Sequence, residues 1–100
     1  MTKEEKLYHE VAQKNADAEE SQMFGKPCYK INGKAFVAFF QQCMVFKLTG
    51  DVHAKALALK GAQLFDPSGK GRAMKEWVQV PYDHKTKWKS LAQAALDYVG

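Results

Sequence analysis

Apolar and polar residues alternate along this chain in patterns that predict three helices and five strands. Residues 2–20 are expected to form the first helix, because Thr2 and Glu5 have the spacing of a capping box and a thin apolar stripe follows them. A second helix is expected from Thr49 to about Gly61, and a third from Asp83 to about Val99. Apolar runs bounded by turn residues predict strands at residues 28–31, 34–40, 43–48, 63–65 and 74–80.

The last helix has the strongest pattern in the chain. Its apolar positions recur at helical spacing, at Trp88, Leu91, Ala92, Ala95 and Val99. The order of elements is α-βββ-α-ββ-α, which predicts an α+β fold in two layers, with a mostly antiparallel five-stranded sheet packed by helices. The 100 residues fit a single domain spanning residues 1–100.

Turn residues set the expected register of the sheet. Asn32-Gly33 is a strong signal for a two-residue hairpin turn, and it places Cys28 opposite Val37. Gln41-Gln42 is a poorer turn signal between the next two strands. Cys28 and Cys43 then lie on strands separated by a third, which is too far for a disulfide.

This register makes the sheet apolar on both faces. One face is predicted to carry Cys28 with the apolar residues of the next two strands, and two helices are expected to cover it. The thin first helix is expected to cover the other face incompletely. The resulting apolar patch predicts an interface with a second copy of the chain, or with another protein, at Tyr29, Phe36, Phe40 and Val45.

Composition adds a charge asymmetry. The net charge is +4, yet residues 1–22 carry −3 and residues 23–100 carry +7. Two interpretations stay open: the acidic first helix neutralises a basic surface, or a basic face remains free for nucleic acid or another polyanion. The loop at 68–72 has the glycines and cations of an anion-binding nest, and lysines cluster at the start of the last helix. The candidate anion or partner surface is Lys70, Arg72, Lys75, Trp77, Lys85 and Lys89.

No residue set for catalysis, a metal or a cofactor stands out. His9, His53 and His84 lack a second ligand at metal spacing. Both cysteines lie in apolar runs, with no base in view. No apolar run is long enough for a membrane helix, and no secretory signal is visible. These observations predict a cytoplasmic, non-enzymatic protein.

An ordered series of segments resembles the TfoX N-terminal-domain family. The segments are Met23-Phe24-Gly25, residues 32–37, Lys47-Leu48, Phe65-Asp66-Pro67, residues 71–78, Val80-Pro81 and a closing helix with Trp88 and residues 92–98. The resemblance runs from about Leu7 to Val99. It implies an α+β fold, related in architecture to YjbR-like proteins, and no catalytic residues. Members of the family include parts of transcriptional co-regulators.

Three functions follow in order of preference. The first is a small binding or regulatory domain that acts through protein contacts, including contacts with itself. The second is weak nucleic-acid binding that reads no sequence, because the chain offers lysines for phosphates and no base-reading motif. The third is an enzyme or a binder of small anions, for which no nucleophile, base and orienting group can be assembled.

Overall fold

The computed structural model describes residues 2–14, 17–71 and 73–100, and within them three α-helices cover a six-stranded antiparallel sheet. The strand order is β1-β2-β3-β4-β6-β5. The α+β class is therefore confirmed, whereas the expected five strands are wrong. The elements are α1 (Lys3–Ala12), β1 (Glu19–Met23), β2 (Lys26–Ile31), β3 (Lys34–Phe40), β4 (Cys43–Lys47), α2 (Gly50–Leu57), β5 (Gln63–Phe65), β6 (Met74–Val80), the 3-10 turn η1 (Tyr82–His84) and α3 (Lys85–Val99).

The additional strand, β1, takes the place of the second half of the predicted first helix. α1 already ends at Ala12, and β1 pairs antiparallel with β2 from Glu19 opposite Lys30 to Met23 opposite Lys26. Beyond Val11 and Ala12 the helical stripe consists of alanines, so a longer helix would bury little apolar surface. A strand in the same place pairs the backbone groups along the edge of β2, and this pairing outweighs helix propensity.

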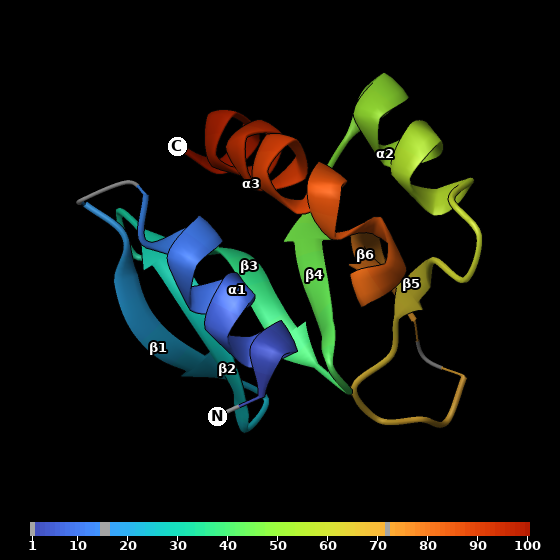
Figure 1. Cartoon of the computed structure of the whole chain (residues 1–100), viewed down its shortest axis with the longest axis horizontal. Helices are drawn as coiled ribbons and strands as arrows, with labels where there is room; N and C mark the ends of the chain where they lie inside the picture. The colour runs from blue at the N-terminus through green and yellow to red at the C-terminus, as the bar shows by residue number, and fades with distance from the viewer. Residues whose placement is uncertain (1, 15–16, 72) are drawn as a thin grey trace.

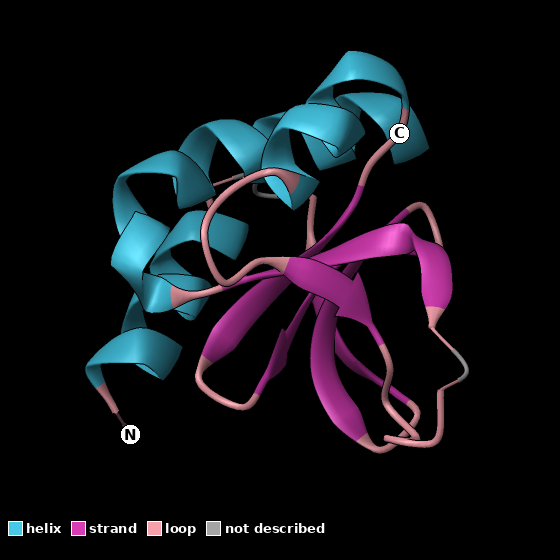
Figure 2. Cartoon of the chain, turned by 90° about the vertical axis from the view of Figure 1, so that its right-hand side faces the viewer, coloured by secondary structure: helices cyan, strands magenta, loops and turns pink. Residues whose placement is uncertain are grey.

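The main core lies between the sheet and all three helices, which share one face (Figures 1 and 2). Trp88 of α3 is fully buried there, and its indole N–H donates to the Pro81 carbonyl at 3.3 Å. Leu91, Ala92 and Ala95 of the predicted stripe are also buried. The sequence pattern of the last helix is thus confirmed, although a 3-10 turn precedes α3 and His84 is its N-cap instead of Asp83.

A bulge in β3 corrects the predicted register. Ile31 pairs with Lys34 as expected, but Tyr29 pairs with Val37 and Cys28 with Ala38, so Phe36 is an extra residue. A shift by one residue moves side chains to the opposite face of a strand. Tyr29 and Phe36 therefore join the helix-covered core, and Cys28 leaves it.

The other face of the sheet encloses a second, smaller core. Figure 2 shows the sheet strongly curved on the side away from the helices. The buried residues there are Cys28, Ala38, Val45, Phe65 and Trp77. Both cysteines are free, as predicted, and burial raises the pKa of each thiol. The thiols stay protonated at neutral pH, which fits a role in packing.

Candidate functional sites

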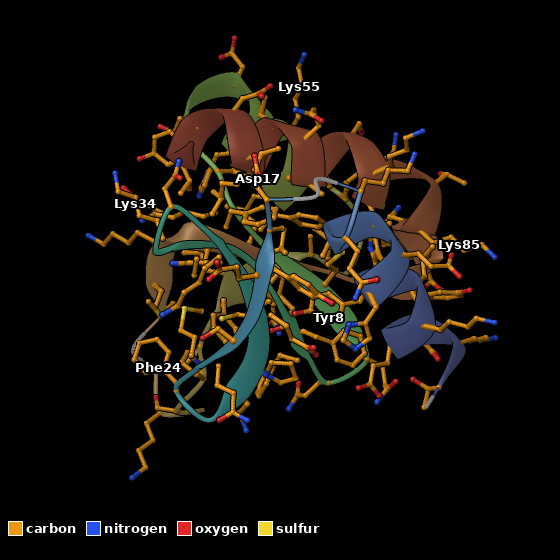
Figure 3. All side chains as sticks on the ribbon, turned by 90° about the vertical axis from the view of Figure 1, so that its left-hand side faces the viewer. Tyr8, Asp17, Phe24, Lys34, Lys55 and Lys85 are labelled. Atoms are coloured by element: carbon orange, nitrogen blue, oxygen red, sulfur yellow. The ribbon has the colours of Figure 1, made fainter. Side chains whose placement is uncertain are left out.

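The seam between α1 and α3 gathers lysines from two segments that are far apart in sequence. Lys14 follows α1 and Lys89 lies on α3, and their ammonium groups are close enough that Lys89 lowers the pKa of Lys14. Nearer the start of α3, the Nζ atoms of Lys3 and Lys85 lie 5.4 and 5.0 Å from the centre of the Tyr82 ring. Figure 3 shows Lys85 at the start of α3. We call these four lysines the cationic seam.

Beneath Lys14 and Lys89 is a groove of about 450 Å³ with a largely apolar floor. Val11 and Ala12 of α1 meet Ala92 and Leu96 of α3 there, over Phe36 of β3. Polar side chains of α3 line the rim, namely Thr86, Ser90 and Gln93. The groove therefore combines positive charge with apolar surface, and this is the chemistry of a site for an amphipathic anion.

A hydrogen-bonded cluster fixes α1 to the sheet. The Tyr29 hydroxyl lies 2.8 Å from His9 Nδ1 and accepts a hydrogen bond from Gln13 Nε2 at 2.7 Å. Glu5 and Glu20 approach the same imidazole at 3.8 and 3.9 Å. Because α1 is only ten residues long, these contacts to β1 and β2 hold the helix, and with it the groove, in place.

The loop between β5 and β6 does not offer the anion nest that its sequence predicts. The Asp66 carboxylate accepts hydrogen bonds from the backbone N–H groups of Ser68, Gly69 and Gly71, at 3.1, 3.0 and 2.8 Å. It also accepts one from the Ser68 hydroxyl at 2.7 Å. These bonds lower the pKa of Asp66. The nest is therefore filled by the chain's own carboxylate, and an external anion finds these donors occupied.

The structure divides the predicted anion surface. Lys85 and Lys89 belong to the cationic seam on α3, whereas Lys70 is exposed on the loop after β5 and Lys75 is exposed on β6, next to the edge strand. Trp77 is only 5% exposed and packs in the smaller core, so it presents no recognition surface. Arg72 lies outside the described residues. Lys3 and Lys14 were missed because the sequence places them in an acidic segment.

The predicted apolar interface is also corrected. Tyr29 and Phe36 are buried beneath the helices because of the bulge, and Val45 is buried in the smaller core. Phe40 alone of the four keeps partial exposure. The four side chains therefore do not form one patch for self-association.

A large cavity lies among the described residues at the end of the sheet away from the Asn32-Gly33 turn. It measures about 780 Å³ and is lined by Lys26, Pro27, Phe39, Phe40, Gln41, Gln63, Leu64, Asp66, Pro67, Ser68, Gly69 and Gln79. Three glutamines are among the lining residues, one from a turn, one from β5 and one from β6. Gln79 is 5% exposed and is the one buried polar residue among those the structure describes. No sequence signal marked these glutamines.

Two turns at this end have unusual backbone geometry. Gln41 and Gln42 have φ angles of +51° and +62°, and Phe24 has +53°. Such angles are uncommon for residues other than glycine, asparagine and aspartate. Phe24 is also 62% exposed, and Figure 3 shows it at the tip of the β1–β2 hairpin. Strained backbone is therefore found at the end of the sheet that holds this cavity, and Gln41 is one of its lining residues.

No protein-family model, curated protein or solved structure matches this chain in the three comparisons. The resemblance to the TfoX N-terminal domain therefore stays an expectation from the sequence, and function has to be argued from the sites themselves. None of the helices in the described part of the chain has the length and apolar character needed to cross a membrane. Within the same residues, no three His, Cys, Asp or Glu side chains are grouped in a way that could hold a metal ion.

Proposed function

We propose that this chain is a non-catalytic protein-binding domain whose partner presents an acidic, amphipathic helix to the seam between α1 and α3. The observation that carries the proposal is the pair formed by Lys14 and Lys89 above an apolar groove. Two adjacent ammonium groups repel each other, and a carboxylate placed between them removes that repulsion. An amphipathic helix supplies this carboxylate and apolar side chains for the floor.

The remaining residues of the seam support an elongated partner. Lys85 is one helical turn before Lys89, and Lys3 reaches the same Tyr82 ring as Lys85 from α1. A helix lying along the seam would therefore meet positive charge at both ends of its contact. Its leucine-type side chains would replace water on Val11, Ala92 and Leu96.

Nucleic acid is the second candidate, and the same four lysines favour it. Lysines bind phosphates as point charges, without reading bases. The apolar floor between Lys14 and Lys89 gives a phosphate backbone nothing to bury, so we prefer the protein partner. We do not propose an enzyme: Ser21 and His9 line one shallow cavity among the described residues, but the imidazole Nδ1 there lies 2.8 Å from the Tyr29 hydroxyl and no hydrogen bond joins it to Ser21.

The test uses a fluorescent synthetic helix with glutamates on one face and leucines on the other, followed by anisotropy. Reversing the seam with Lys14→Glu and Lys89→Glu should weaken binding at least about tenfold, because attraction becomes repulsion. The matched control is Lys55→Glu with Lys60→Glu on the α2 side, which makes the same change in net charge on exposed residues. This control should bind normally.

Two results would overturn the proposal. One is the absence of peptide binding at millimolar concentration. The other is tighter binding of a short DNA duplex than of the peptide, with an affinity that falls steeply with salt and is lost in the seam variant. The second result would identify the seam as a phosphate-binding surface.

A further inference from the structure

The cavity at the strained end of the sheet is independent of the seam, and its dimensions suit a small ligand. Its volume of about 780 Å³ falls in the range usual for such sites, roughly 300–1,000 Å³. β2 and the end of β3 form one side, and β5 with the following loop forms the other. Asp66 braces that loop through its four hydrogen bonds, so this wall is held in shape without a ligand.

The neutral amides at this site determine which hydrogen-bonding groups a ligand would need. Gln79 is nine-tenths buried and lines the cavity, directly opposite Gln63 on the neighbouring strand. Each side-chain amide carries a donor and an acceptor side by side, and the Gln79 amide also interacts with the Cys43 thiol, whose pKa it lowers against the effect of burial. A planar group with an adjacent acceptor and donor on one edge matches this pattern, and the edge of a nucleobase is such a group.

The charges at the cavity indicate where a phosphate would lie. Lys26 lines the cavity, and its ammonium lies 5.2 Å from the centre of the Phe40 ring. Asp66, the cavity's carboxylate, directs both oxygens into its own loop. The charge of Lys26 is thus left for the ligand, beside an aromatic ring and apolar surface from Phe39 and Leu64.

The backbone strain at the rim of the cavity also favours a ligand site. Gln41 lines the cavity and holds a φ of +51°, and Phe24 holds +53° two residues before Lys26. Strained residues persist where the surrounding structure imposes them, and they are frequent at ligand sites. Replacing Gln41 by a residue better suited to this turn would relieve strain and withdraw its amide from the cavity.

We propose that this cavity binds a mononucleotide, with the base edge against the amides of Gln63 and Gln79 and the phosphate at Lys26. The amides supply hydrogen bonds that distinguish one base from another. Lys26 supplies the charge that distinguishes a nucleotide from a nucleoside.

Calorimetric titration with AMP, GMP, CMP and UMP tests this, with the four nucleosides and inorganic phosphate as separate arms. One nucleotide should bind measurably more tightly than the others, its nucleoside more weakly, and phosphate alone not at all. Lys26→Met, which keeps an apolar stem over Phe40, should weaken the nucleotide about tenfold and leave the nucleoside unchanged. Gln63→Ala should weaken both about fivefold, the value of one lost hydrogen bond.

Gln63 and Lys26 are not fully buried, so these variants should fold normally, and thermal unfolding of each checks this. Gln22→Ala, an exposed glutamine on β1 that does not line the cavity, is the matched control and should bind like the parent protein. The proposal is overturned if no nucleotide binds at millimolar concentration. It is equally overturned if all four nucleotides bind alike and Gln63→Ala has no effect, because the site is then only a cation attracting phosphate.

Discussion

Each end of the sheet contains a two-residue turn with positive φ angles, but the residues in the two turns differ. At one end β2 turns into β3 through Asn32-Gly33, with φ angles of +52° and +78°. At the other end β3 turns into β4 through Gln41-Gln42, with nearly the same angles. Asparagine and glycine adopt this conformation readily, whereas glutamine does not. The first turn is thus made of residues suited to its backbone, whereas the second is strained and adjoins the cavity of about 780 Å³.

The strands explain how the strained turn persists. Phe39 pairs with Met44 and Phe40 with Cys43, so the register is set before the chain reaches the turn. Met44 is fully buried and Phe39 almost so, and a slipped register would expose them. The burial of side chains along β3 and β4 therefore imposes positive φ angles that glutamine disfavours.

Exchanging the two turns should give the largest effect on stability. Gln41→Asn with Gln42→Gly should stabilise the protein by about 2 kcal/mol, because two strained residues are relieved. Asn32→Gln with Gly33→Gln should destabilise it by a similar amount. A Cβ at Gly33 meets no atom within 4 Å, so the cost there comes from the backbone alone. Urea unfolding measures both, and equal midpoints for all three proteins would contradict the comparison.

Thr2 connects the strained turn to the helix layer. Its hydroxyl accepts a hydrogen bond from the Glu5 backbone N–H at 3.1 Å, as the capping box predicts, and donates one to Gln42 Oε1 at 2.7 Å. Thr2→Ala should lower the free energy of unfolding by about 1 kcal/mol through loss of the cap. In the variant that already carries Gln41→Asn and Gln42→Gly, the same change should cost less, since the bond to the Gln42 side chain is already absent. Identical costs in the two proteins would show that this bond contributes nothing.

The elements predicted correctly from sequence are those with strong, local signals. α3, β5 and β6 follow from periodicity and turn residues alone. The end of α1 and the existence of β1 depend on pairing with β2, which no local pattern encodes. The bulge at Phe36 is equally invisible, and that one residue removes Tyr29 and Phe36 from the predicted interface. Two of the four lysines of the cationic seam, Lys85 and Lys89, were predicted from the sequence, because they lie on a helix with a clear apolar stripe.

Phe24 is the second strained position at this end, and changing it should have a smaller effect. Phe24→Asn should stabilise the protein by about 1 kcal/mol or less, because asparagine tolerates a positive φ and the ring makes little contact at 62% exposure. Phe24→Ala keeps the unfavourable Cβ and should change stability little. A clear loss of stability in Phe24→Asn would mean that the ring packs against the chain after all.

The loop between β5 and β6 also lies at the strained end of the sheet, but hydrogen bonds to the Asp66 carboxylate stabilise its backbone. Hydrogen bonds hold the pKa of Asp66 below its usual value, with the Ser68 hydroxyl contributing most. A depressed folded-state pKa means that Asp66 stabilises the fold above the ordinary aspartate pKa, and that this contribution is lost as the pH falls through and below about 4.

The Asp66→Asn variant should therefore be less stable than the parent protein at pH 7, and the difference should shrink towards pH 3. The effect should be the smallest of the series, because the loop is exposed and water competes for the same hydrogen bonds. Urea midpoints measured from pH 7 to pH 3 test it, and a constant difference across that range would mean that the carboxylate charge does not hold the loop.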